Sequence, residues 1–118
     1  MISVIMPSYN EEKVLPGTLQ ALFAQPGKFE TIVVDGGSTD RTCAVAKSFG
    51  FIDGVHDYNR SSEASRNTLH ASRLTFYAPK GRASQMNAGA KQAKGEWLLF
   101  LHADTRLPEG AIQRLNDM

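Results

Sequence analysis

Short apolar runs alternate along this chain with segments in which apolar residues recur every three or four positions. The apolar runs predict strands over residues 2–6, 31–34, 74–77 and 96–101. The periodic segments predict helices carrying the apolar residues of 14–23 and 43–49, and spanning about 83–94 and 108–117. Strands that alternate with helices are typical of right-handed βαβ units, so we expect an α/β fold: a parallel sheet covered on both faces by helices.

Polar turns follow three of the predicted strands, at Ser8–Glu11, Asp35–Asp40 and His102–Thr105. The carboxyl ends of parallel strands lie at one edge of a sheet, and open α/β sheets bind their ligands there. The pattern therefore brings these turns together as a candidate functional edge.

The turn Asp35–Asp40 contains two glycines, which allow a sharp bend and a close approach to a ligand. Ser38 or Thr39 could cap the helix that follows, and a helix N-terminus favours an anion. Asp35 could accept hydrogen bonds from a base or a ribose. Gly-Gly-Ser-Thr-Asp is also ordinary turn and cap chemistry, and the motif alone favours neither interpretation.

Other polar residues near strand ends have equally open roles. Tyr9 could stack on a base and Glu11 could bind ribose hydroxyls, although a solvated loop is favoured when that turn is taken alone. Four polar residues surround the start of the third predicted helix: Lys80, Arg82, Gln85 and Asn87. Arg82 could contact a phosphate or a sugar, or it could lie at a solvated helix end.

The apolar run Trp97–Leu101 predicts a fully buried strand, and it is closed by His102 and Asp104. An imidazole and a carboxylate together suit Mn²⁺, Zn²⁺ or Fe²⁺, whereas two carboxylates suit Mg²⁺ better. A His-x-Asp pair is weak evidence by itself, because polar residues often end strands.

Composition narrows the classes of function. A chain of 118 residues with 42% hydrophobic content predicts one globular domain, and a net charge of +1 gives no reason to expect nucleic acid as a partner. Neither the dinucleotide-binding fingerprint nor the P-loop motif occurs. Cys43 is the single cysteine, which makes a cytoplasmic location the default, and its helical context predicts a small buried residue.

The segment 51–73 is an atypical polar insertion without a clear period. Phe51, Ile52 and Val55 could start a strand, and residues 65–69 could form a helical turn. The sequence does not decide between these interpretations.

Four motifs, taken in order, resemble those of the family-2 glycosyltransferases with the GT-A fold. They are Val4–Glu11, Ile32–Asp40, Arg82–Ala90 and Leu99–Asp104. The resemblance covers nearly the whole chain except the segment 51–73. The last two look closest to a bacterial branch associated with arsenosugar biosynthesis. The resemblance implies a Rossmann-like (GT-A) parallel sheet with flanking helices, spanning 1–118 and truncated after the metal motif.

The same resemblance implies that the chain binds a nucleotide-diphospho-sugar, usually a UDP-sugar. Six residues match nucleotide-binding positions: Pro7, Tyr9, Glu11, Asp35, Gly36 and Arg82. Asp104 matches the last aspartate of the family's D-x-D motif, which binds a divalent metal such as Mn²⁺ or Mg²⁺ on the diphosphate. His102 stands where the family commonly has the first aspartate of that motif.

The chain ends at Met118, before the region in which the family places its acceptor site and catalytic base, so no base is assigned. We expect an uncovered apolar edge, and as its partner either a second copy (a homo-oligomer) or a missing C-terminal half. The protein could associate peripherally with a membrane through its acceptor. The alternative functions are a non-catalytic nucleotide-binding module and a self-associating remnant without a ligand.

Overall fold

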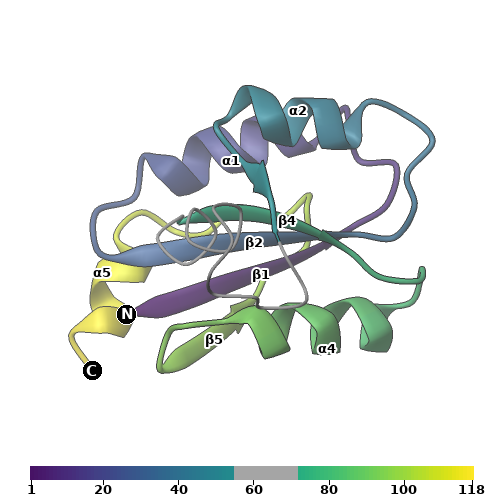
Figure 1. Ribbon diagram of the computed structural model, residues 1–118. Coiled ribbons are helices and arrows are strands. Elements are labelled where there is room, and N and C mark those ends of the chain that lie inside the picture. The colour runs from purple at the N-terminus through teal and green to yellow at the C-terminus, as the bar shows by residue number, and fades with distance from the viewer. Residues whose placement is uncertain (55–71) are drawn as a thin grey trace.

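The computed structural model describes residues 1–54 and 72–118. Its elements, in chain order, are β1 (Ile2–Ser8), α1 (Leu15–Phe23), β2 (Phe29–Asp35), α2 (Thr42–Ser48), β3 (Ile52–Asp53), β4 (Arg73–Tyr77), α4 (Arg82–Gln92), β5 (Trp97–Phe100) and α5 (Ala111–Asn116). The strands form one parallel sheet in the order β3-β4-β2-β1-β5. Helices α1 and α2 cover one face of the sheet and α4 covers the other (Figure 1). The predicted Rossmann-like α/β architecture is confirmed.

The sheet has a hydrophobic core on each face, because successive side chains of a strand point to opposite sides. Val4, Met6 and Val33 pack in the core beneath α1, whereas Ile5 and Val34 belong to the core beneath α4. The small residues of α4 allow a close approach to the sheet. A Cβ atom on Gly89 would lie 2.5 Å from the Cγ2 of Ile5 and 3.0 Å from that of Val34.

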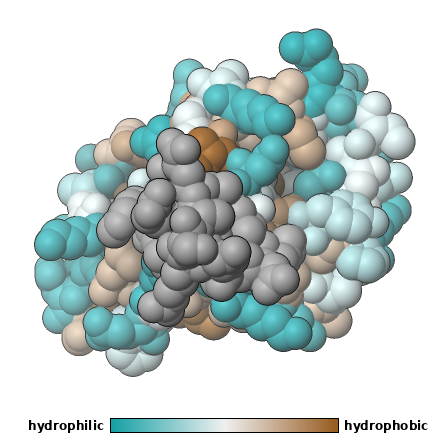
Figure 2. All heavy atoms as spheres, in the orientation of Figure 1, coloured by the Kyte–Doolittle hydropathy of each residue, from teal (hydrophilic) through white to brown (hydrophobic). Residues whose placement is uncertain are grey.

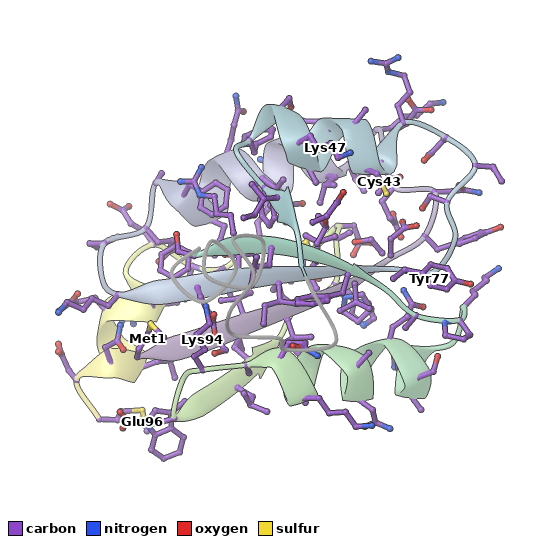
Figure 3. The ribbon with its side chains drawn as sticks, in the orientation of Figure 1. Met1, Cys43, Lys47, Tyr77, Lys94 and Glu96 are labelled. Carbon is purple, nitrogen blue, oxygen red and sulfur yellow. The ribbon has the colours of Figure 1, made fainter. Side chains whose placement is uncertain are left out.

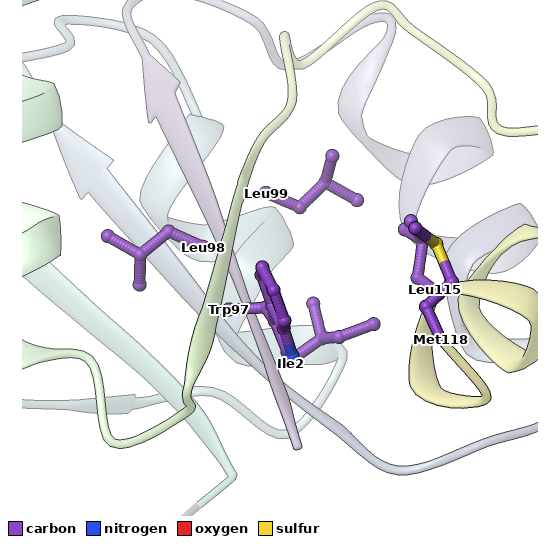
Figure 4. A pocket seen from close by; sticks show the side chains of 6 residues that line it. All are labelled: Ile2, Trp97, Leu98, Leu99, Leu115 and Met118. Atoms are coloured by element: carbon purple, nitrogen blue, oxygen red, sulfur yellow. The ribbon is translucent and has the colours of Figure 1, made fainter.

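Strand β5 lies at the edge of the sheet, and the prediction of a fully buried strand was wrong. Trp97 is 60% exposed, Leu98 43% and Phe100 41%. A pocket of about 240 Å³ lies beside this strand and is lined by apolar side chains, namely Ile2, Trp97, Leu98, Leu99, Leu115 and Met118 (Figure 4). The uncovered apolar edge that we expected is therefore present. An apolar run shows that a strand favours burial, but it does not show which surface, if any, covers the strand.

Two local predictions within residues 38–53 need correction, and one open choice is partly resolved. Helix α2 has its N-cap at Arg41 rather than at Ser38 or Thr39. Cys43 is exposed rather than buried, because the residues that the short helix buries are Thr42 and Ala46. The open choice after Phe51 is partly resolved, since Ile52 and Asp53 form β3 and pair with β4.

The central part of the polar insertion, including the possible helical turn at 65–69, lies outside the described residues. Two helices differ in extent from their predictions: α4 ends at Gln92, and α5 covers only Ala111–Asn116. In residues 1–54 and 72–118, no helix is long and apolar enough to cross a membrane. On the face seen in Figure 2, hydrophilic residues predominate around small hydrophobic areas.

Candidate functional site at the carboxyl ends of the strands

The polar turns meet at one edge of the sheet, as the sequence predicted. Ser8 at the end of β1 is in register with Asp35 at the end of β2, and Asp35 with Tyr77 at the end of β4. The turn after β5 joins them because the Leu101 amide donates to the Ile5 carbonyl at 2.9 Å. The loops that leave β1, β2 and β4 lie on the right of Figure 1.

The turns after β1 and β2 are joined by hydrogen bonds centred on Asn10. Its amide donates to the Ser38 hydroxyl at 2.8 Å, and its side-chain oxygen accepts from the Thr39 amide at 2.8 Å. The Glu11 amide donates to the Thr42 hydroxyl at 2.8 Å. Asn10 adopts the left-handed backbone conformation with φ of 52°, which asparagine tolerates better than most residues. Sequence reasoning gave Asn10 no role, and its signal was asparagine in a tight turn.

Asp35 is buried and organises its own loop. One carboxylate oxygen accepts from the Gly37 and Ser38 amides at 2.9 and 2.8 Å, and the other accepts from the Ser38 hydroxyl at 2.5 Å. These contacts are what the turn interpretation requires. Ser38 therefore cannot also cap α2. Asp35 also faces a pocket of about 400 Å³ that is lined by Cys43 and Tyr77 among others.

The Cys43 thiol lies beside this carboxylate. Partial desolvation of the thiol, followed by the charge and hydrogen bonding of Asp35, raises the pKa of Cys43. Figure 3 shows Cys43 on α2 and Tyr77 at the end of β4, both on the strand-end side of the molecule. A thiol with a raised pKa is less nucleophilic at neutral pH, so this position has no signature of a reactive cysteine.

Gln85 holds the strand ends together from α4. Its buried amide nitrogen donates to the carbonyls of Ser8 and Val34 at 3.0 and 2.8 Å, and its oxygen accepts from the Gly81 amide at 3.1 Å. Gly36 packs directly against it, since an added Cβ would lie 3.1 Å from the Gln85 side chain. Gly36 thus serves close packing, and the sequence showed Gln85 only as one of several polar residues near a helix start.

Tyr9, in the turn after β1, is half-buried and contacts Lys80. The Lys80 ammonium nitrogen lies 4.0 Å from the centre of the Tyr9 ring, which is a cation–π arrangement. The contact places a positive charge from the loop before α4 beside the turn that the sequence linked to nucleotide binding.

Arg82 and His102 come together although they lie on different elements. Nη2 of Arg82 is 2.5 Å from Nε2 of His102. A guanidinium group has donors only, so Nε2 accepts and the imidazole proton resides on Nδ1. With Pro7, these side chains line a pocket of about 120 Å³.

The turn that carries His102 and Asp104 is anchored by the residue between them. Ala103 is 2% exposed, and its carbonyl accepts from the Thr18 hydroxyl of α1 at 2.5 Å. With Ala103 held inward, His102 and Asp104 are left exposed at the strand-end edge.

Three carboxylates influence one another on this edge. Partial burial, followed by repulsion from Asp104 and Asp40, raises the pKa of Glu11. Desolvation opposes the shift of Asp40, but hydrogen bonds from the Thr42 hydroxyl and amide hold its pKa below the ordinary value. The edge therefore carries concentrated negative charge next to Arg82.

The predicted metal ligands fit a metal only in part. In the residues that the structure describes, no three His, Cys, Asp or Glu side chains are grouped so that they could hold a metal ion. Mg²⁺ in nucleotide-dependent enzymes is commonly held by one or two carboxylates together with substrate phosphates. Asp104, with Glu11 nearby, fits that arrangement. His102 does not, because its Nε2 lone pair is engaged by Arg82.

Comparisons with known proteins agree with this architecture. The family described as Glycosyl transferase family 2 matches residues 3–117. A PGL/p-HBAD biosynthesis glycosyltransferase of Mycobacterium bovis is 36% identical over 110 residues, which are 92% of this chain and 37% of the relative.

Solved structures give the same result. The crystal structure of S. aureus TarS 1-349 superposes with a TM-score of 0.76 at 26% identity, covering 98% of this chain and 31% of TarS 1-349. Its complex with UDP-GlcNAc gives 0.65 at 29% identity, over 98% and 29% of the two chains. The mannosyltransferase PcManGT of Pyrobaculum calidifontis, solved with GDP-Man and Mn²⁺, shares the fold with a TM-score of 0.70 at 23% identity, over 92% and 29%.

The chain thus spans about a third of the length of the relatives it matches, between 29% and 37% of those compared above. The narrower likeness to the arsenosugar branch stays a prediction. With the GT-A architecture, the matched family and the sequence identity in agreement, this chain belongs to the family-2 glycosyltransferases.

Proposed function

We propose that this chain is the donor-binding part of a glycosyltransferase that takes a UDP-sugar with Mn²⁺ or Mg²⁺ and transfers the sugar to an acceptor. One observation carries the proposal: charges of opposite sign lie side by side at the strand-end edge. Glu11 and Asp104 repel each other there, and Arg82 reaches the same turn. A nucleoside diphosphate with its cation carries the complementary charges, because the cation suits the carboxylates and the phosphates suit the guanidinium.

The individual roles follow from side-chain chemistry. Asp104 would hold the cation, with Glu11 as a second carboxylate, and the guanidinium of Arg82 would donate to the diphosphate oxygens. When bound, the cation supplies neutralisation of the charge that develops on the leaving nucleoside diphosphate. Pro7 and Tyr9 would line the nucleotide pocket.

Asp35 and Gly36 would support the base from the second turn. The carboxylate of Asp35 holds the loop in shape by accepting hydrogen bonds from backbone amides of that loop. A base would donate to the lone pairs of the carboxylate that remain unused. The choice of UDP over other nucleotides is supported by TarS, which was solved with UDP and with UDP-GlcNAc.

Isothermal titration of the chain with UDP, with and without Mn²⁺, tests this function. We expect UDP to bind and Mn²⁺ to tighten the binding. Asp104→Ala should abolish the metal-dependent part, whereas Asp117→Ala, which removes an exposed carboxylate at the end of the chain, should not. Absence of heat under both conditions would contradict the donor site, and unchanged metal dependence in Asp104→Ala would contradict the metal assignment.

The relatives are about three times as long as this chain, so transfer of the sugar to an acceptor is part of the proposal rather than an observation. We assign the catalytic base to no residue within it. Binding of UDP without release of UDP from a UDP-sugar would favour the alternative of a nucleotide-binding module without catalysis. Cytoplasmic location, self-association and membrane contact through the acceptor stay predictions.

A further inference from the structure

We propose that His102 is a positioning residue that holds Arg82 toward the donor diphosphate and is not itself a metal ligand. This inference rests on the proposed function. It assigns a role to the position at which this chain departs from the D-x-D motif that it resembles.

The contact itself is the first argument. Nη2 of Arg82 lies 2.5 Å from Nε2 of His102, within hydrogen-bonding distance. Arginine cannot accept, so the imidazole accepts with Nε2 and carries its proton on Nδ1. Neither ring nitrogen then has a lone pair left for a metal ion.

The second argument is that buried neighbours anchor the backbone of both Arg82 and His102. Arg82 is the first residue of α4, and Gln85 ties the start of that helix to the ends of β1 and β2. His102 precedes Ala103, which is buried and bonded to Thr18. These two anchors fix the distance between the backbones of Arg82 and His102. The two exposed side chains can therefore contact each other.

The third argument concerns what such a contact does for binding. An exposed arginine samples many rotamers, and binding a diphosphate would cost that freedom. A hydrogen bond to His102 restricts the guanidinium in advance, beside the pocket that both residues line with Pro7. Its remaining donors stay available for phosphate oxygens, since the guanidinium carries five N–H groups.

Ring tautomer is the direct readout. In ¹⁵N NMR spectra of the chain, the His102 ring should carry its proton on Nδ1, and Arg82→Ala should shift the proton to Nε2. The spectrum of His102→Gln identifies which resonances belong to His102. A ring protonated on Nε2 in the wild-type protein would overturn the contact, whatever the protein binds.

Affinities for UDP and for uridine test the role, because uridine lacks the diphosphate. His102→Ala should weaken UDP binding about tenfold, the effect of one hydrogen bond to a charged group, and leave uridine binding unchanged. His102→Gln, whose amide oxygen can accept from Arg82, should restore most of the loss. Lys91→Ala, which removes an exposed cation farther along α4, is the matched control.

The outcomes separate this inference from the proposed function. Equal weakening of UDP and uridine by His102→Ala would mean a merely structural role, and unchanged UDP affinity would mean no role in positioning. Either result overturns the inference and leaves the donor site standing. A wild-type chain that binds neither ligand overturns the proposed function and the role of His102 with it.

Discussion

Replacement of Gln85 by leucine should destabilise the fold at the strand ends. The wild-type side chain is 4% exposed and makes hydrogen bonds to the Ser8 carbonyl, the Val34 carbonyl and the Gly81 amide. A typical hydrogen bond contributes about 1 kcal/mol net, and a buried group left without its partner costs about 1–3 kcal/mol. The Ser8 carbonyl keeps a second donor in the Gly36 amide, so its loss is the smaller one. We expect Gln85→Leu to lower the free energy of unfolding by about 2–3 kcal/mol.

Urea denaturation followed by far-UV circular dichroism measures this change. Gln20→Leu makes the same chemical substitution at an exposed position of α1 and should change the free energy of unfolding by no more than about 0.5 kcal/mol. A loss in Gln85→Leu that equals the control would refute the reasoning, because the three hydrogen bonds would then contribute nothing that water cannot replace.

Three further predictions concern charged or ionisable side chains. Partial burial and neighbouring carboxylates raise the pKa of Glu11 above 4.5, so its ionisation lowers the stability of the fold as pH rises through the raised pKa. Glu11→Gln should therefore have a higher Tm than the wild type at neutral pH. In thermal melts below pH 4.5, the Tm difference between the two proteins should vanish. Glu30 is buried and accepts from the Ser3 hydroxyl at 2.5 Å and the Lys94 amide at 2.6 Å, so Glu30→Gln should cost about 1–3 kcal/mol in urea denaturation, and an unchanged midpoint would contradict this. His102→Asp supplies a carboxylate, and Mn²⁺ should tighten UDP binding more in this variant than in the wild type when both are titrated calorimetrically.

Much of the fold was predictable because burial on a sheet leaves a pattern. Strands β1, β2 and β4 are apolar runs with both faces covered, and α1 repeats its apolar residues at helical spacing. Strand β3 has two residues, which is too short to show any period. The residues of β5 by themselves predicted a buried strand, because Trp97 and Phe100 have the same apolar character whether or not a surface covers them.

The site was predictable in its location but not in its contacts. The sequence brought Glu11, Asp35 and Asp104 to one edge, and the structure places their turns there. The resemblance implies that Asp35 contacts a ligand, which stays a prediction, and in the structure its carboxylate closes its own loop. Asn10 was given no part, although it joins two of the turns.

By itself, the sequence determined a parallel α/β sheet and the gathering of its polar turns at the carboxyl edge. Alternating strands and helices with right-handed connections leave little choice in that arrangement. Only the tertiary structure decided which side chains meet across it: Gln85 with Ser8, 77 positions away, and Arg82 with His102, 20 positions away. Hydrogen bonds depend on tenths of an ångström in the placement of separate elements, and no local pattern of residues encodes that distance.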